Sequence, residues 1–334
     1  MLKKIVLKTL DLLLLLTVAL LIIWVMISQP LFMSSNEINC VKYISSEELN
    51  TSVYEMVEKF DGRVYDDLKV LDATASYIYT EFSEQGALVH YQNYELEGLL
   101  EEDVYQYKNV IADFNGTEYC SDGLRIVGAH YDTYDGLAGA NDNTSGVAGL
   151  LAIAKALKRQ PPRCDVQLVA YTLEEPPAFR TKKMGSYIHA KRLKEQGVKV
   201  KYALVLETIG FYSSEPNSQN YPVPLMNWYY PKEANFVALV SNFANIFTVR
   251  EIKSSMQSSG MYLPVYSINA PTFIPGVDFS DHRNYWEFDI PSVMVTDTAF
   301  YRSDNYHHES DTPDTLDYDR MAEVVEAVFS LIRK

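Results

Sequence analysis

Apolar runs of strand length recur through the middle and the C-terminal part of the chain. Four of them cover residues 126–130, 165–173, 201–206 and 291–295. Strands that are buried on both faces read as nearly continuous apolar runs. Because segments of helical periodicity alternate with these runs, the pattern predicts an α/β fold. We expect a mixed, mostly parallel central sheet with helices on both faces.

The remaining pattern predicts the elements around this sheet. Amphipathic helices are expected at residues 45–60, 66–82, 143–158, 184–195, 232–247 and 318–333. Alternating apolar and polar positions at 88–96 and 104–114 are typical of edge or antiparallel strands. Two long polar and aromatic connections, 213–231 and 254–281, are expected to be loops that shape a pocket.

Composition narrows the class of protein. The chain has 334 residues, 47% of them hydrophobic, which is enough for one large α/β domain. A formal net charge of −15 argues against binding to nucleic acid. The three cysteines, Cys40, Cys120 and Cys164, allow at most one disulfide, and without a Cys-x-x-Cys pair a zinc–thiolate site is excluded as the main chemistry.

The candidate chemistry lies where the apolar runs end. The side chains there are His, Asp and Glu, which are ligands that suit zinc. They are His130, Asp132, Asp142, Glu174, Glu175, Glu207, His307 and His308. Because ligands bind at the carboxyl ends of the strands in open α/β sheets, we expect these side chains to converge. The set fits two metals that share a bridging carboxylate, together with a general base.

Six stretches in a fixed order carry a family resemblance. They are GAHYDT, GANDNTSG, LEEPP, LETIG, FSDHRNYW and YHHESDTPDTLDY, and they extend from about Gly128 to Tyr318. The chain resembles the two-zinc exopeptidases of the bacterial leucyl aminopeptidase, aminopeptidase S and aminopeptidase Y type. Glutamate carboxypeptidases and glutaminyl cyclases are more distant members. The resemblance implies a zinc exopeptidase fold, with two Zn²⁺ expected per chain.

Carried over by position, the resemblance also implies roles for individual residues. His130, Glu175, Glu207 and His307 would bind metal, Asp142 would bridge both metals, and Glu174 would be the general base. Asp132 would accept the second ring N–H of His130 and thereby fix its tautomer. The adjacent His308 leaves the last ligand open by one residue. His282 and Tyr212 are candidate substrate contacts.

The N-terminus predicts a membrane anchor. Residues 10–27 are apolar apart from Asp11 and Thr17, and about 18 helical residues span roughly 27 Å. Lys3, Lys4 and Lys8 precede this segment, so the positive-inside rule leaves the N-terminus cytoplasmic. We expect a basic tail at 1–9, a transmembrane signal anchor at 10–28, a linker at 29–44 and a zinc peptidase domain at 45–334. The domain would then be periplasmic or extracellular.

These observations favour a membrane-anchored aminopeptidase that acts on peptides or small amides. A carboxypeptidase or dipeptidase remains an alternative, because Arg180, Arg283 and Arg302 are candidates to hold a substrate carboxylate. A glutaminyl cyclase is a second alternative, and a non-catalytic binding protein on a peptidase scaffold is a third. The sequence leaves the oligomeric state and the preferred terminal residue open.

Overall fold

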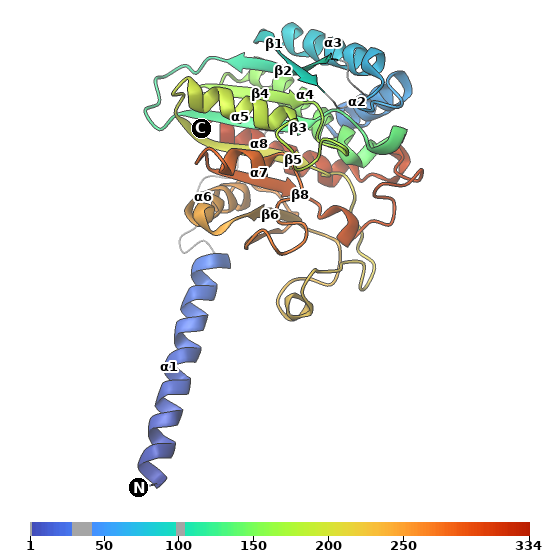
Figure 1. The fold of residues 1–334 in the computed structure, drawn as a ribbon. Helices are drawn as coiled ribbons and strands as arrows, with labels where there is room; N and C mark the ends of the chain where they lie inside the picture. Colours follow the sequence, from blue (N-terminus) through green and yellow to red (C-terminus); the bar gives the residue numbers. More distant parts are fainter. Residues whose placement is uncertain (1, 29–41, 98–103) are drawn as a thin grey trace.

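An eight-stranded mixed sheet forms the centre of the molecule (Figure 1). The computed structural model describes residues 2–28, 42–97 and 104–334. The strands are β1 (Leu88–Glu97), β2 (Val104–Phe114), β3 (Leu124–His130), β4 (Val166–Tyr171), β5 (Val200–Glu207), β6 (Val237–Ser241), β7 (Val265–Asn269) and β8 (Ser292–Thr296). Their order across the sheet is β1-β2-β4-β3-β5-β8-β6-β7.

The four central strands, β4, β3, β5 and β8, are parallel. At one side β2 and β1 are added antiparallel, and at the other β6 is antiparallel to β8 and parallel to β7. The predicted mixed α/β sheet is therefore confirmed, and its parallel pairing is concentrated in the centre. This arrangement brings the carboxyl ends of four strands to one edge.

Helices cover both faces of the sheet. The longer helices are α2 (Ser46–Lys59), α3 (Leu68–Glu84), α4 (Gly146–Arg159), α5 (Gly185–Glu195), α6 (Ile246–Gln257) and α8 (Tyr318–Ile332), and α7 (His282–Trp286) is a short one. Successive strand residues point to opposite faces. Val127 and Leu204 pack in the core layer that includes α4 and α8, whereas Ile126 and Ala203 pack against α5 and α7.

One predicted helix and one predicted loop were wrong. The expected helix at 232–247 contains β6, and only its end belongs to α6, which starts at Ile246. The expected loop at 254–281 contains the end of α6 and all of β7. All five residues of β6 are buried between β8 and β7. Pairing with residues distant in the chain decides the conformation of so short a segment, whatever its local periodicity.

The apolar N-terminal segment forms the helix α1 (Leu2–Ser28), which extends away from the domain in Figure 1. Leu12 to Leu16 are all exposed. Within the parts of the chain that the structure describes, no helix combines the length and the apolar character that crossing a membrane requires. Most of the predicted linker, with Cys40, lies outside the described residues. Cys120 and Cys164 form a disulfide.

Candidate active site

The predicted metal-binding side chains meet at the carboxyl edge of the central parallel strands. His130 and Glu207 end β3 and β5, and the Glu174–Glu175 pair follows β4. Asp142 comes from the irregular helical turn η2 (Ala140–Ser145) that leads into α4. The segment after β8 supplies His307. These side chains are buried except that of His307, which is 25% exposed.

The first group of candidate ligands surrounds His130. Its Nε2 lies 3.3 Å from Oδ1 of Asp142 and 3.4 Å from Oε2 of Glu207. Its Nδ1 is 3.0 Å from the backbone carbonyl oxygen of Asp132. Because a carbonyl oxygen only accepts, this bond places the ring proton on Nδ1 and leaves the Nε2 lone pair free to bind a cation.

The second group surrounds His307. Its Nε2 lies 3.0 Å from Oδ2 of Asp142 and 3.5 Å from Oε1 of Glu175. The two carboxylate oxygens of Asp142 therefore face different histidines, as a bridging ligand requires. His308 is exposed, so the structure places His307, and not its neighbour, in the cluster.

The donor atoms fit two zinc ions. Zinc–nitrogen and zinc–oxygen distances are about 2.0–2.2 Å, so two ligands of a tetrahedral zinc lie roughly 3.3–3.6 Å apart. The separations within the two groups, from 3.0 to 3.5 Å, are close to this range. Three buried donor atoms, His130 Nε2, Glu175 Oε1 and His307 Nε2, have no hydrogen-bond partner. Unpaired buried polar atoms are costly, and binding to a cation would satisfy all three.

A family comparison now decides the class of protein. The model of peptidase family M28 matches residues 109–332. The chain is also 47% identical over 271 residues to the uncharacterized protein YfbL of Escherichia coli (strain K12), covering 78% of this chain and 80% of that protein.

The chain belongs to peptidase family M28.

Solved structures share the fold of this M28 peptidase. A leucine aminopeptidase precursor from Bacteroides thetaiotaomicron superposes with a TM-score of 0.67 at 17% identity, covering 89% of this chain and 99% of its own. A glutaminyl cyclase from the same organism gives 0.65 at 16% identity, with coverage of 89% and 99%. The LapA aminopeptidase of Legionella pneumophila gives 0.64 at 17% identity, with coverage of 87% and 73%.

Glu174 lies beside both groups of this M28 site. Donor atoms of His130, Glu174 and Glu175 all lie within 4.8 Å of one another. Burial raises the pKa of Glu174 well above its usual range, and the negative charges of Glu175 and Glu207 raise it further. A buried carboxylate with an elevated pKa holds a proton strongly, which is the property required of a general base near neutral pH.

The electrostatics of the M28 cluster favour cations. Burial, followed by the charge of Asp142, raises the pKa of Glu175 to about 8. Burial alone would lower the pKa of His307, but Asp142 and Glu175 raise it to about 10. The carboxylates that attract a proton to this ring also attract a metal. Four carboxylates, Asp142, Glu174, Glu175 and Glu207, carry the charge that two divalent cations would neutralise.

The role predicted for the Asp132 side chain needs correction. Oδ1 of Asp132 is 3.6 Å from His130 Nδ1, and the hydrogen bond runs instead to the backbone oxygen. The two carboxylate oxygens accept the backbone N–H groups of Glu174 and Glu175, at 3.1 and 3.0 Å. Asp132 therefore positions the base and a ligand through their backbone, in addition to holding His130 through its carbonyl.

Sequence reasoning missed three residues that position the ligands. Asp311 accepts the backbone N–H groups of Asn141 and Asp142 at 2.8 and 3.0 Å. Ser280 donates to Glu207 at 2.6 Å. Arg63 is buried behind the site and donates to the carbonyl of Tyr131 at 2.8 Å. Asp311 and Ser280 stand inside the family stretches, whereas no local signal distinguishes Arg63.

The two predicted substrate contacts, His282 and Tyr212, do not face the pocket beside the site. His282 is fully buried in α7 with Nε2 2.9 Å from the carbonyl of Val277, and burial lowers its pKa to about 4. The Tyr212 hydroxyl donates to the carbonyl of Ile209 at 3.0 Å. Both side chains pack inside the domain, where their polar atoms are bonded to backbone.

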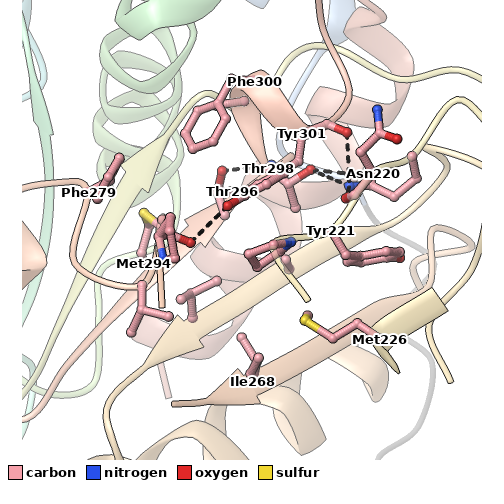
Figure 2. A pocket seen from close by; sticks show the side chains of 18 of the residues that line it. Asn220, Tyr221, Met226, Ile268, Phe279, Met294, Thr296, Thr298, Phe300 and Tyr301 are labelled. Atoms are coloured by element: carbon pink, nitrogen blue, oxygen red, sulfur yellow. Dashed lines mark hydrogen bonds between the residues drawn. The ribbon is translucent and has the colours of Figure 1, made fainter. Parts of the chain in front are cut away.

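An apolar pocket opens beside the Glu207 side of the metal cluster (Figure 2). It holds about 800 Å³ of space, including its open mouth. Glu207 and Tyr306 belong to its wall, which connects it to the cluster. The pocket lies over β6, β7 and β8, and the segment after Gln219 forms its outer side. The two predicted pocket-shaping segments thus contribute to it, although one of them contains β7.

Proposed function

We propose that this M28 peptidase is a two-zinc aminopeptidase, which hydrolyses the first peptide bond of substrates with a free N-terminus. The observation that carries this proposal is the position of Asp142, with one carboxylate oxygen toward His130 and the other toward His307. The aminopeptidases among its structural neighbours support the choice of reaction. Because every ligand and the base are present, a purely non-catalytic binding role is disfavoured.

The residues divide the chemistry among them. His130 and Glu207 would hold one zinc, Glu175 and His307 the other, and Asp142 both. Bound zinc lowers the pKa of water toward 7 and polarises a carbonyl oxygen. Glu174 takes a proton from the attacking water and delivers it to the leaving amine nitrogen, so that the amide bond breaks without a charged amide anion. Asp132 keeps Glu174 and Glu175 in place through their backbone N–H groups.

Carboxypeptidase action is disfavoured by the positions of the three candidate arginines. Arg180 and Arg283 both pair with the buried carboxylate of Asp278. Arg302 is buried, with its Nε 3.0 Å from Oε1 of Gln219 and its Nη1 3.0 Å from the carbonyl of Phe236. In contrast, the carboxylates of the cluster offer a negative environment that suits a substrate amine.

Glutaminyl cyclase activity is the second candidate, because cyclases are among the solved structures with nearly the same TM-score. A cyclase converts an N-terminal glutamine to pyroglutamate and releases ammonia without cutting the chain. The donor set for two metals and the apolar pocket favour the aminopeptidase.

The test uses three matched peptides and the purified protein loaded with zinc. One peptide has a free N-terminus, one is N-acetylated, and one begins with glutamine. The proposal expects release of the first residue from the unblocked peptide alone, with close to two zinc ions per chain. Cleavage that requires a free C-terminal carboxylate would contradict it, and so would loss of ammonia without chain cleavage.

We also propose that the N-terminal segment anchors the enzyme to a membrane, with the catalytic domain on the non-cytoplasmic side. The support is the apolar sequence of residues 10–27, the preceding lysines and the exposed leucines of α1. Extraction of membranes with carbonate tests this proposal. The anchored protein stays in the pellet, whereas a protein released to the supernatant would contradict the anchor.

A further inference from the structure

The apolar pocket beside Glu207 carries an inference about the substrate class, and it rests on the proposed function. We infer that the pocket binds a large apolar side chain, aromatic or branched aliphatic, of the N-terminal substrate residue. Small, charged and amide side chains would be disfavoured.

The wall of the pocket is built from apolar side chains of several elements. Met294 comes from β8, Ile268 from β7, and Met226 from the 3₁₀ turn η3 (Pro224–Trp228). Figure 2 shows these three around the opening, with Phe279 and Phe300 across from them. Aromatic and sulfur-containing walls suit large apolar groups because they offer a wide, polarisable contact area.

The polar tips of the lining tyrosines are turned away from the pocket. Tyr221 donates to the carbonyl of Pro231 at 2.6 Å, Tyr230 to that of Ser267 at 2.7 Å, and Tyr301 to that of Pro275 at 3.0 Å. Their hydroxyl hydrogens are therefore used, and their rings form the wall. A glutamine amide or a charged group would lose its hydration in this pocket without new partners.

Charge points the same way. Glu207 is the one charged residue that lines the pocket within the described part of the chain, and it belongs to the metal cluster. The inner part of the pocket thus has no described partner for a lysine, arginine, aspartate or glutamate side chain. Its volume, about 800 Å³ with the mouth, is within the range of small-molecule sites and exceeds the need of an alanine.

Met226 provides a specific test because its neighbour supplies a matched control. Met226 lines the pocket, whereas the adjacent Leu225 is 64% exposed. Both lie on a surface segment outside the metal cluster. Met226→Glu puts a carboxylate in the pocket wall, and Leu225→Glu makes the same charge change outside it.

Hydrolysis of aminoacyl-4-nitroanilides of Phe, Leu, Ala, Lys and Glu measures the preference. We expect kcat/KM for Phe and Leu to exceed that for Ala, Lys and Glu by roughly 100-fold or more, since a single methylene in an apolar pocket is worth about 10- to 200-fold. Met226→Glu should lower the Phe-to-Lys ratio at least about 10-fold, and Leu225→Glu should leave it unchanged. Similar rates for all five substrates, or equal effects of the two variants, would overturn the inference.

A binding measurement separates this inference from the proposed reaction. Calorimetry with phenylalaninamide, alaninamide and lysinamide on the zinc-loaded Glu174→Gln protein reports the pocket without turnover. Tightest binding of phenylalaninamide, weakened by Met226→Glu, supports the pocket even if no peptide is cleaved. Equal binding of the three amides overturns the pocket assignment, whether or not peptides are cleaved.

Discussion

The ring of Tyr134 is stacked on the imidazole of His307, with centroids 3.9 Å apart and an interplanar angle of 7°. The ring of Tyr306 stacks on the same imidazole, also at 3.9 Å and at 15°. His130 is fixed differently, by the hydrogen bond of its Nδ1 to a backbone carbonyl. The partly exposed metal-binding histidine is therefore held between two tyrosine rings, which fix the plane of its ring.

Tyr134→Ala should weaken metal binding at the His307 position and spare the His130 position. Loss of groups that orient a ligand typically lowers metal affinity about 10- to 100-fold. Zinc per chain, measured after dialysis against chelators of graded strength, should fall from two toward one at milder conditions than for the wild type. Tyr134→Phe keeps the stacked ring and is the control. An Ala variant that retains two zinc ions as tightly as the wild type would show that stacking does not position His307.

Asp311→Ala should destabilise the turn that carries Asp142. The substitution leaves two buried N–H groups, of Asn141 and Asp142, without their acceptor. An unsatisfied buried donor costs about 1–3 kcal/mol, so urea denaturation should show a loss of at least this size. Asp314→Ala, at an exposed position of the same segment, should change the free energy of unfolding by about 0.5 kcal/mol or less. Equal losses in the two variants would contradict the positioning role of Asp311.

His189 should make the domain sensitive to acid. Burial lowers the pKa of His189 to about 3 in the folded protein, whereas an unfolded histidine has a pKa of about 6.5. Between these values the unfolded chain binds more protons than the folded one, so stability is lost as the pH falls below about 6.5. The slope from this residue is up to about 1.4 kcal/mol per pH unit.

His189→Gln tests that contribution because glutamine can hydrogen-bond with the partners of His189, the Tyr285 hydroxyl and Gln167, without titrating. Urea unfolding of the variant and the wild type between pH 7 and pH 4.5 gives the two slopes. The variant should lose less stability over this range. Parallel curves for the two proteins would refute the assignment.

The sequence predicted the central strands and the cluster because both depend on strong local patterns. The runs before His130, Glu175 and Glu207 are buried on both faces, and their carboxyl ends meet at one edge of a parallel sheet. The segment around Val237 was misread because pairing with distant strands determines its conformation. The partners of Arg63 lie about 70 to 80 residues along the chain, so only the tertiary structure reveals its position behind the site.

The contacts of Asp132 and His282 show a second limit of sequence reasoning. Spacing placed Asp132 next to His130, but it could not tell whether the carbonyl or the carboxylate accepts the ring proton. Nor could it tell that His282 points into the domain, toward the carbonyl of Val277. Such choices depend on side-chain and backbone directions that a one-dimensional motif does not contain.

The most direct test of the account is the combined measurement of zinc content and peptide hydrolysis in the Glu174→Gln variant. Glu174 takes no part in the two ligand groups of His130 and His307, so the variant should keep two zinc ions per chain. Its turnover of an unblocked peptide should fall at least about 10²- to 10⁴-fold, because the proton acceptor is gone. Glu309→Gln, at an exposed carboxylate near His307, should keep both properties. Full hydrolysis by the zinc-loaded Glu174→Gln protein, or full activity of wild-type protein without any bound metal, would contradict the account.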